Sequence, residues 1–373
     1  MSLKIVSDLS SLCELAARDA DDAEAAGRLT EPVVAALRDT GIAGLGLPPS
    51  LGGEAAPPQQ TVVVLEQVGR ADGSAGWVAM IAATTAVLSA YLPHDEAARI
   101  WAGGPRAIVG GVYAPKGVAT PVGDGCSISG TWSFGSGCLH ADWLSGGVII
   151  DGSPRLAFFP ASEVTIHPTW EVIGLRATGS HDFTAQDLTV PASRIVDVRA
   201  GGLHVDLPLY RFPIFGLLAS GIAGVCLGIA GGALDSFVAL AREKTPTGAR
   251  RTLAARASTQ EGVAKAATAL GAARSYLLAV LEDLWAKATT GDSLDTSDRA
   301  RLRLAATHAV EEAARVTTDL YRMAGGTAVY RSAPLERRLR DIHTATQHMM
   351  VGRPTWELAG RVLLGIEETH PEL

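Results

Sequence analysis

The sequence of 373 residues has few cysteines, few aromatic residues and little excess charge. Its four cysteines lie far apart, with no CxxC pair and no metal-ligand spacing, which is typical of a reduced cytosolic protein and not of a disulfide scaffold. The net charge is only −7, from 32 basic and 39 acidic residues, and this mild acidity argues against a nucleic-acid-binding protein. Residues Met1–Asp8 contain no basic segment followed by an apolar core, so we expect no signal peptide.

Several catalytic motifs are also absent from the sequence. It contains no GxGxxG after a predicted strand, no phosphate-binding loop, no GxSxG turn and no HExxH helix. These absences argue against a Rossmann dehydrogenase, an α/β-hydrolase and a zinc hydrolase. His343 and His348 lie about 140° apart around one predicted helix, so we expect no metal bound between them.

One long uncharged run raises the question of whether the protein crosses a membrane. Residues Phe212–Leu234 are long enough to span a bilayer. The run is rich in Ala and Gly, however, and amphipathic helices follow it where a membrane protein would have further spans. We therefore expect a helix buried in the core of a helical domain.

The hydrophobic fraction of 47% is enough for two or three domains with substantial cores. Residues 1–104 have apolar side chains at helical spacing, residues 105–207 form short β-branched segments, and residues 208–373 return to long helical patterns. The strands follow one another without intervening helices, which predicts an antiparallel barrel or sandwich. The long helices with short links predict a four-helix bundle. The fold class is α+β, mainly α.

The predicted elements have the following bounds. Helices are expected in the first domain at Ser7–Leu29, Glu31–Asp39, Pro58–Ala71, Ser74–Tyr91 and His94–Trp101, and in the last at Phe215–Glu243, Ala257–Lys287, Asp295–Met323 and Pro334–Leu364. The clearest strands are Ala107–Tyr113, Trp143–Ile150, Arg155–Phe159 and Phe183–Val190. A hairpin turn is expected at Val122–Gly125.

Two segments of the middle domain are rich in residues that bind ligands. The segment Gly130–Trp143 combines two indoles, a phenyl ring and hydroxyl groups with glycines. It is either a wall for a planar heterocycle or a Gly-rich turn with structural tryptophans. The segment Trp170–Asp182 crowds Arg176, Thr178, Ser180 and His181 into one loop.

Two further segments belong to the last domain. The glycines of Ala324–Tyr330 either approach a phosphate or end a helix, which is the commoner role of such a pair. The segment Pro334–His348 carries a basic cluster of Arg337, Arg338 and Arg340 that faces either solvent or an anion. Its two histidines are either satisfied core residues or functional groups.

The domain order and these four segments resemble the acyl-CoA dehydrogenase superfamily over essentially the whole chain. The most similar branch is that of the two-component flavin-dependent monooxygenases, which includes aromatic hydroxylases and dibenzothiophene-type monooxygenases. Its motifs recur as Gly130, Trp132, Phe134, Ser136, Gly137, Ala141, Asp142 and Trp143, as the segment Trp170–Ser180, and as the Gly-Gly, Arg-Asp and His pattern of residues 325–348. The resemblance implies an acyl-CoA dehydrogenase-like fold with an N-terminal helical domain, a middle antiparallel β-barrel and a C-terminal four-helix bundle.

The resemblance also assigns roles by position. Ser136 matches a hydroxyl that hydrogen-bonds the flavin N5/O4 edge, Phe134 matches an aromatic residue against the ring, and Trp132 would help to shape that wall. His348 matches a histidine beside flavin and substrate, which would deprotonate a phenol or hydrogen-bond the flavin peroxide. The implied catalytic residues are His348 and Ser136. Gly325 and Gly326 match a turn that approaches a neighbouring subunit's cofactor. The implied cofactor-binding residues are Trp132, Phe134, Ser136, Gly137, Arg176, Ser180, Gly325, Gly326 and Tyr330.

Two departures from the family patterns bear on the reaction. The glutamate base of ordinary acyl-CoA dehydrogenases falls near Met349 here, and no acidic residue lies between Asp341 and Glu357. A thioether cannot accept a proton at neutral pH, although some members carry the base on another helix. The histidine that some aromatic hydroxylases carry after a motif like Gly76–Val78 is replaced by Thr84 or Thr85, which indicates a different substrate or outcome.

We therefore expect a flavin-dependent monooxygenase that uses reduced flavin and O2, through a C4a-hydroperoxide, on a small organic substrate, aromatic ones included. The flavin is FMN or FAD, with FMN preferred. A separate reductase would supply it reduced, because the chain has no recognisable nicotinamide site. We expect a cytoplasmic homotetramer that binds neither nucleic acid nor membranes. The alternatives are a flavin dehydrogenase or oxidase of the acyl-CoA dehydrogenase type and a flavin-free binding protein with the same fold.

Overall fold

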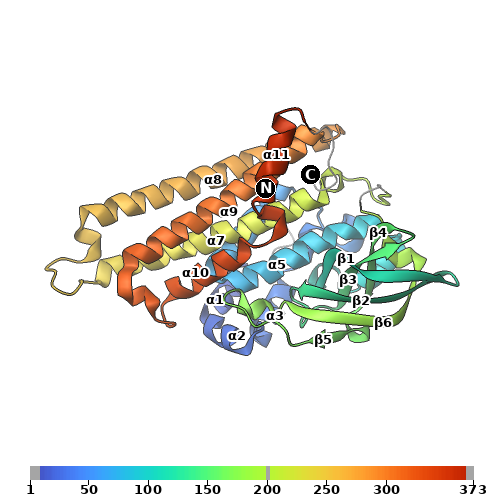
Figure 1. The fold of residues 1–373 in the computed structure, drawn as a ribbon, viewed down its shortest axis with the longest axis horizontal. Coiled ribbons are helices and arrows are strands. Elements are labelled where there is room, and N and C mark those ends of the chain that lie inside the picture. The colour runs from blue at the N-terminus through green and yellow to red at the C-terminus, as the bar shows by residue number, and fades with distance from the viewer. Residues whose placement is uncertain (1–8, 199–201, 367–373) are drawn as a thin grey trace. The chain divides into compact units, whose positions relative to one another are not determined.

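The computed structural model describes residues 9–198 and 202–366 (Figure 1). Met1–Asp8, where we expect no signal peptide, and the first two residues of the helix predicted from Ser7 lie outside this description. Helices come first, strands occupy Val109–Val196, and long helices follow, in the order that the sequence predicts.

The N-terminal helices are α1 (Leu9–Arg18), α2 (Ala20–Ala26), α3 (Glu31–Asp39), α4 (Pro58–Ala71), α5 (Gly73–Ala86) and α6 (His94–Ile100). The bounds of α3 and α4 are those predicted. The single helix predicted up to Leu29 is instead divided between α1 and α2. The division falls at Asp19, whose carboxylate accepts hydrogen bonds from Arg18 and, at 2.8 Å, from the Thr30 hydroxyl. Both bonds hold the Asp19 side chain at the junction between α1 and α2.

The strands are β1 (Val109–Val122), β2 (Gly125–Gly135), β3 (Trp143–Ile150), β4 (Ser153–Pro160), β5 (Thr165–His167), β6 (His181–Pro191) and β7 (Ile195–Val196). They form one sheet in the order β5-β6-β2-β1-β3-β4-β7. The predicted turn between β1 and β2 is present, with Val122 paired to Gly125.

The prediction of an antiparallel barrel is wrong in two respects. The strand order ends at β5 and β7, so the sheet is open, and β1 pairs with β3 in parallel. The segment between β2 and β3 returns the chain to the start of β1, and β3 therefore runs in the same direction as β1. The two edge strands have only three and two residues, which is too short to close a barrel.

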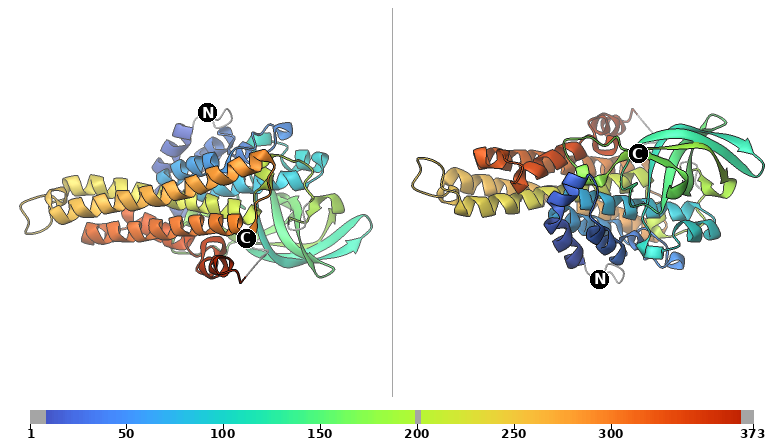
Figure 2. Two further views of the ribbon diagram at one scale, coloured as in Figure 1. Left: turned by 90° about the horizontal axis from the view of Figure 1, so that it is seen from above. Right: turned by 90° about the horizontal axis from the view of Figure 1, so that it is seen from below.

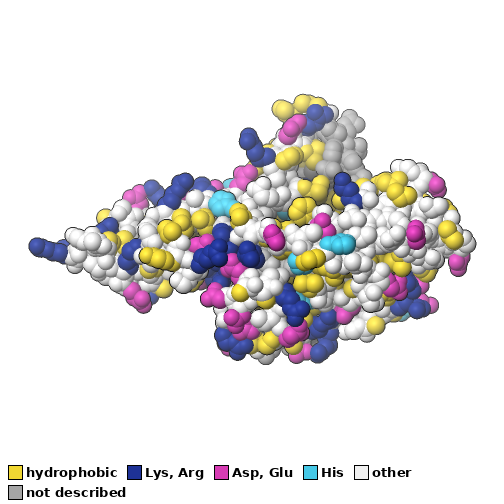
Figure 3. Space-filling model, turned by 60° about the horizontal axis from the view of Figure 1, so that its bottom comes forward, with side chains coloured by type: hydrophobic (Ala, Val, Ile, Leu, Met, Phe, Trp, Pro, Cys, Tyr) yellow, Lys and Arg dark blue, Asp and Glu magenta, His cyan; other side chains and the backbone are white. Residues whose placement is uncertain are grey.

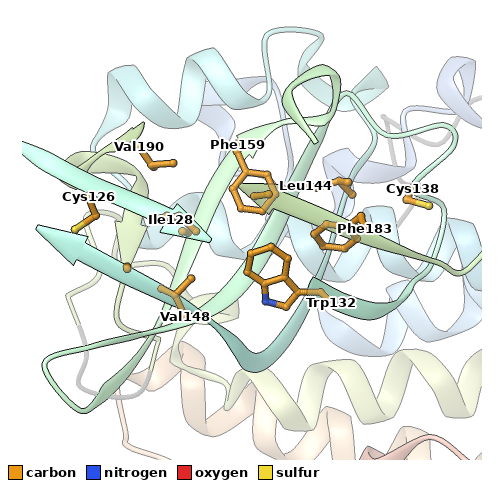
Figure 4. Close-up of a cluster of buried hydrophobic side chains, with 12 residues drawn as sticks. Cys126, Ile128, Trp132, Cys138, Leu144, Val148, Phe159, Phe183 and Val190 are labelled. Atoms are coloured by element: carbon orange, nitrogen blue, oxygen red, sulfur yellow. The ribbon is translucent and has the colours of Figure 1, made fainter. Parts of the chain in front are cut away.

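The core of the sheet is built around the indole of Trp132 (Figure 4). Its ring lies 5.3 Å from that of Phe183 and 5.7 Å from that of Phe159, between ring centroids. A Cβ on Gly146 would lie 2.6 Å from the indole, so only glycine leaves room for the ring there. The indole Nε1–H donates to the Gly147 carbonyl at 2.8 Å, which satisfies its one polar atom.

The C-terminal helices are α7 (Ile214–Glu243), α8 (Ala257–Thr290), α9 (Thr296–Ala324), α10 (Pro334–Ala345) and α11 (Pro354–Leu363). Helices α8 and α9 lie side by side in both views of Figure 2. Phe237, Ala266, Leu320 and Leu335, one from each of α7 to α10, belong to one buried cluster. Their arrangement as a four-helix bundle stays a prediction.

The helix predicted over Pro334–Leu364 is interrupted. It ends at Ala345, a short turn covers Met349–Val351, and α11 begins at Pro354. Proline has no backbone N–H to donate and is tolerated in the first turn of a helix, so Pro354 suits the start of α11. The interruption places His348 at the N-terminus of the short turn.

Two helical stretches, Gly73–Tyr91 and Ile214–Glu243, are long and apolar enough to cross a membrane, and 94% of the apolar window of each is buried. Burial of this extent agrees with the prediction of a core helix. In α7 a Cβ on Gly224 would lie 2.9 Å from the Val62 carbonyl oxygen, so small residues let α7 approach α4 closely. On the surface shown in Figure 3, basic and acidic side chains lie interspersed.

The described chain divides into two compact units. Among the described residues, unit 1 comprises residues 9–57, 77–172, 176–198 and 202–214, and unit 2 comprises residues 58–76, 173–175 and 215–366. Helix α4 thus groups with the C-terminal helices. The predicted domains of residues 1–104, 105–207 and 208–373 stay a prediction.

Two buried carboxylates meet inside unit 2. Asp72 is 5% exposed and accepts from the Ala75 N–H at the start of α5, and Asp341 is 3% exposed and accepts from the Leu175 N–H at 2.6 Å. Burial, with a smaller contribution from Asp72, raises the pKa of the Asp341 carboxyl from 3.8 to about 7. The nearby Arg337 and Arg340 offset this effect only in part.

This geometry predicts a stability that falls with rising pH. The folded state holds a proton on Asp341 that the unfolded state has lost, so between about pH 4 and 7 this residue stabilises less as pH rises, by at most about 1.4 kcal/mol per pH unit. Asp341→Asn, which keeps an acceptor for Leu175, should flatten that dependence in urea unfolding followed by circular dichroism. Asp21→Asn at an exposed site is the control. Parallel pH profiles for wild type and Asp341→Asn would contradict the prediction.

Candidate active site

The end of β2 exposes one aromatic ring, that of the strand's penultimate residue. Phe134 is 69% exposed, and its ring meets that of Trp170 edge-on with centroids 6.0 Å apart. Its φ angle of 69° lies in the left-handed region, which bulky residues rarely adopt. Such backbone strain persists only where the surrounding structure enforces it, and it is commonest at functional sites. The end of β2 therefore exposes a flat apolar ring on which a planar ligand can stack.

Two residues further on, Ser136 begins a chain of buried hydroxyl groups. The Trp77 Nε1–H donates to Ser136 Oγ at 3.1 Å, Ser136 Oγ lies 2.7 Å from Ser180 Oγ, and Ser180 Oγ lies 2.7 Å from Thr178 Oγ1. Ser136 is 8% exposed, Ser180 2% and Thr178 1%. We call Trp77, Ser136, Ser180 and Thr178 the hydroxyl chain. All four belong to unit 1.

Backbone contacts hold the two loops of this site together. The Gly137 N–H donates to the Thr178 carbonyl at 2.9 Å, and the Cys138 thiol donates to the Gly179 carbonyl at 3.3 Å. Gly137 and Gly179 both have positive φ, so each takes a conformation that suits glycine. Burial raises the pKa of the Cys138 thiol to about 11, so the thiol stays protonated and serves as a hydrogen-bond donor.

Two predicted cofactor-binding residues of unit 1 lie outside the hydroxyl chain and make their described contacts elsewhere. Trp132 is fully buried in the core of the sheet, so it supports the strand that carries Phe134 and offers no surface for direct contact with flavin. Arg176 donates to the Val172 carbonyl at 3.2 Å and lies 4.0 Å from the Glu24 carboxylate. Contact of Arg176 with flavin stays a prediction.

His348 belongs to unit 2, in a polar setting formed with α9. Its Nδ1 accepts from the Met350 N–H at 3.2 Å, and the buried Arg303 donates to the Met350 carbonyl at 3.0 Å. Burial, with a smaller contribution from the Arg303 charge, lowers the pKa of the His348 imidazole to about 4. The ring is therefore neutral at pH 7. Because Nδ1 is an acceptor, we assign the ring proton to Nε2.

The sequence left two roles open for His348, a base or a hydrogen-bond donor. A ring whose pKa is about 4 is a poor base at neutral pH, and its acceptor nitrogen already serves Met350. A neutral ring with its proton on Nε2 can act as a hydrogen-bond donor. The donor role of His348 stays a prediction.

The glycine turn after α9 is exposed. Gly325 ends the helix with φ of 62°, and a Cβ on Gly326 would meet nothing within 4 Å. Tyr330 is 69% exposed. His348 lies near Arg303, 22 residues before Gly325 on the same helix, which corresponds to about 33 Å. The structure therefore does not bring the turn and His348 together within one chain.

Sequence reasoning missed the link between Trp77 and Ser136. The two residues are 59 positions apart, and only the folded unit 1 brings the indole to the hydroxyl. One signal was available, because a tryptophan in an apolar helix must find an acceptor for its N–H when it is buried. Arg303, a buried charge on α9, was also missed.

Comparisons with known proteins identify the family of the chain. Residues 10–94 match the family model of the acyl-CoA dehydrogenase N-terminal domain and residues 220–353 that of the C-terminal domain. The indole-3-acetate monooxygenase of Acinetobacter baumannii is 31% identical, over 96% of this chain and 94% of that protein. The oxygenase subunit HsaA of a flavin-dependent monooxygenase from Mycobacterium tuberculosis is 30% identical, over 86% and 85%.

A solved structure shows the same fold. The crystal structure of 3-HSA hydroxylase from Rhodococcus sp. RHA1 superimposes with a TM-score of 0.91 and 26% identity, covering 98% of each chain. With family-model domains in both helical regions and relatives matched over nearly their full length, the assignment covers the whole chain. The protein belongs to the acyl-CoA dehydrogenase superfamily and, within it, to the flavin-dependent monooxygenases.

Proposed function

We propose that the chain is the oxygenase component of a two-component system, which takes reduced flavin from a separate reductase and uses O2 to hydroxylate a small aromatic substrate. The observation that carries the proposal is the buried Ser136 hydroxyl two residues from the exposed Phe134 ring. One relative is named as an oxygenase subunit and another as acting on indole-3-acetate, and both names support the proposal.

The residues of unit 1 fit a flavin. Phe134 offers a flat apolar face, Ser136 offers a hydroxyl at its edge, and the glycines of the loop allow the backbone to come close. Bound flavin supplies the electrons and the activated oxygen that no side chain can provide. The chain itself holds the ring, directs hydrogen bonds to its polar edge and keeps water away.

His348 acts in this proposal as a hydrogen-bond donor. Its neutral ring, with the proton on Nε2, would donate to an oxygen of the substrate or of the oxidant. Donors fixed in advance toward developing negative charge lower a barrier without further reorganisation. The threonines Thr84 and Thr85, where some aromatic hydroxylases carry a histidine, are buried, and Thr84 bonds back to the Met80 carbonyl. We infer that the substrate is held differently from that of those hydroxylases.

The dehydrogenase alternative is less well supported. The side chain at the expected base position, Met349, is 63% exposed and cannot accept a proton. The nearest preceding carboxylate, Asp341, is buried and bonded to the Leu175 N–H.

We also propose a cytoplasmic homotetramer. The Gly325–Tyr330 turn lies about 33 Å along α9 from the region of His348, so a turn that serves flavin would serve that of a neighbouring subunit. The exposure of Tyr330 supports this contact. The flavin is reduced FMN or FAD, with FMN preferred.

The first test of the function is a single-turnover reaction. The protein, loaded anaerobically with reduced FMN or reduced FAD, is mixed with ¹⁸O2-saturated buffer and indole-3-acetate as the aromatic probe, and products are analysed by mass spectrometry. One ¹⁸O atom in the product, with one of the two flavins preferred, is expected. Tight binding of oxidised flavin that an acyl-CoA bleaches, without oxygen incorporation, would identify a dehydrogenase instead.

The role of Ser136 predicts a coupling defect. Ser136→Ala should raise hydrogen peroxide release per product formed by about two- to tenfold, the value of one hydrogen bond, and weaken flavin affinity less. Ser129→Ala removes a hydroxyl from β2, the strand that precedes Ser136, and should leave coupling unchanged. Unchanged coupling in Ser136→Ala would remove this residue from the proposed role.

The donor role of His348 predicts both a rate and a pH profile. His348→Ala should lower product formation about a hundredfold at near-native stability, whereas His343→Ala, at an exposed site, should behave like wild type. Because burial lowers the pKa of His348 to about 4, wild-type turnover should show no ionisation of this residue between pH 5.5 and 8. If His348→Ala mainly lowers the melting temperature instead, His348 is a structural residue.

A further inference from the structure

The hydroxyl chain can be read as a set of donors and acceptors that must balance. A hydroxyl donates one hydrogen bond and accepts two, whereas an indole N–H only donates. Trp77 therefore always occupies one acceptor position of Ser136. The two remaining contacts, Ser136 to Ser180 and Ser180 to Thr178, join hydroxyls of which either can donate.

Three proton orders make both contacts hydrogen bonds. One of them, in which Ser136 and Thr178 both donate to Ser180, leaves the buried Ser180 proton without a partner in the hydroxyl chain and is therefore costly. In each of the other two, both hydrogen bonds run in the same direction. In the inward order, Ser136 donates to Ser180 and Ser180 donates to Thr178. In the outward order, Thr178 donates to Ser180 and Ser180 donates to Ser136. Because these oxygens are almost fully buried, water is a poor substitute partner, and the order is set within the protein and by the bound ligand.

The two orders give Ser136 opposite hydrogen-bonding roles toward a ligand. In the inward order the Ser136 proton is donated to Ser180, and one acceptor position of Ser136 stays open. In the outward order both acceptor positions are filled, by Trp77 and Ser180, and the Ser136 proton is free to be donated. Reduced flavin carries an N–H at N5, which needs an acceptor, and oxidised flavin has a bare nitrogen there, which needs a donor.

We propose that Trp77, Ser180 and Thr178 are positioning residues that set the proton direction of Ser136 and so determine the preference of the site for reduced over oxidised flavin. This inference rests on the proposed function, since it takes Ser136 to face the flavin N5 edge. The inward order selects the reduced form. Thr178 supports that order because it accepts the proton that Ser180 donates, although it does not touch Ser136 itself.

The inference gives a definite direction for a remote substitution. If the Thr178 hydroxyl is removed, the Ser180 proton has no acceptor in the inward order. In the outward order Ser180 still donates to Ser136, and the only loss is the hydrogen bond that Ser180 accepts from Thr178. A buried donor without a partner is the costlier defect. Removing the hydroxyl at 178 therefore shifts the site toward the outward order and toward oxidised flavin.

The experiment measures dissociation constants for both redox forms of FMN and of FAD, the reduced form anaerobically, by fluorescence titration. The readout is the ratio of the oxidised to the reduced dissociation constant. Thr178→Val, which keeps the side-chain volume, and Ser180→Ala should each lower this ratio about three- to tenfold. Thr178→Ser restores a hydroxyl and should keep the wild-type ratio. Thr131→Ala, which breaks an exposed hydroxyl pair of the same sheet, should also keep it.

The outcomes separate this inference from the function on which it rests. A lowered ratio in Thr178→Val that Thr178→Ser restores supports the inference, since a merely structural defect would weaken both redox forms alike. An unchanged ratio in Thr178→Val and Ser180→Ala, with wild-type circular dichroism, overturns it and leaves the proposed function intact. Wild-type protein that binds neither form of either flavin overturns both. If Ser180→Ala fails to fold, the comparison of Thr178→Val with Thr178→Ser decides the outcome alone.

Discussion

A polar group buried away from water must be hydrogen-bonded, and the candidate site depends on how Ser136 meets this requirement. Its oxygen bonds an indole from α5 and a hydroxyl from the loop before β6, so three separate segments converge on one atom. The same loops are joined by the Gly137 and Cys138 contacts. Phe134, whose φ of 69° is strained, lies just before these fixed residues and is 69% exposed.

Desolvation also determines the chemistry of the titratable groups in unit 2. Burial beside the charge of Arg303 keeps His348 neutral, which turns a residue usually thought of as a base into a donor. Burial has the opposite effect on the protonation of Asp341, whose carboxyl holds its proton up to near neutral pH. One physical cause, the cost of a charge in a dry interior, thus makes a histidine lose its proton and an aspartate keep one.

The secondary structure follows closely from local sequence where the signal is local. The bounds of α3 and α4 agree with prediction because Pro, Gly and a clear apolar period mark them. The prediction failed at Asp19, where α1 ends and α2 begins and whose side chain bonds Thr30, a partner that the local pattern does not show. It failed also in the sheet, because strand patterns show which faces are apolar but do not show that β3 returns beside β1 in parallel.

The sequence by itself determined the family, the succession of helices and strands, and the residue types of the site, because motifs and periodicity are properties of neighbouring residues. It identified Ser136, Phe134 and His348 by their positions in those motifs. Only the tertiary structure decided that Trp132 belongs to the core, that Trp77 bonds Ser136, and that His348 is neutral. The physical reason is that burial, hydrogen-bond partners and pKa depend on residues far away in the chain, which come together only when it folds.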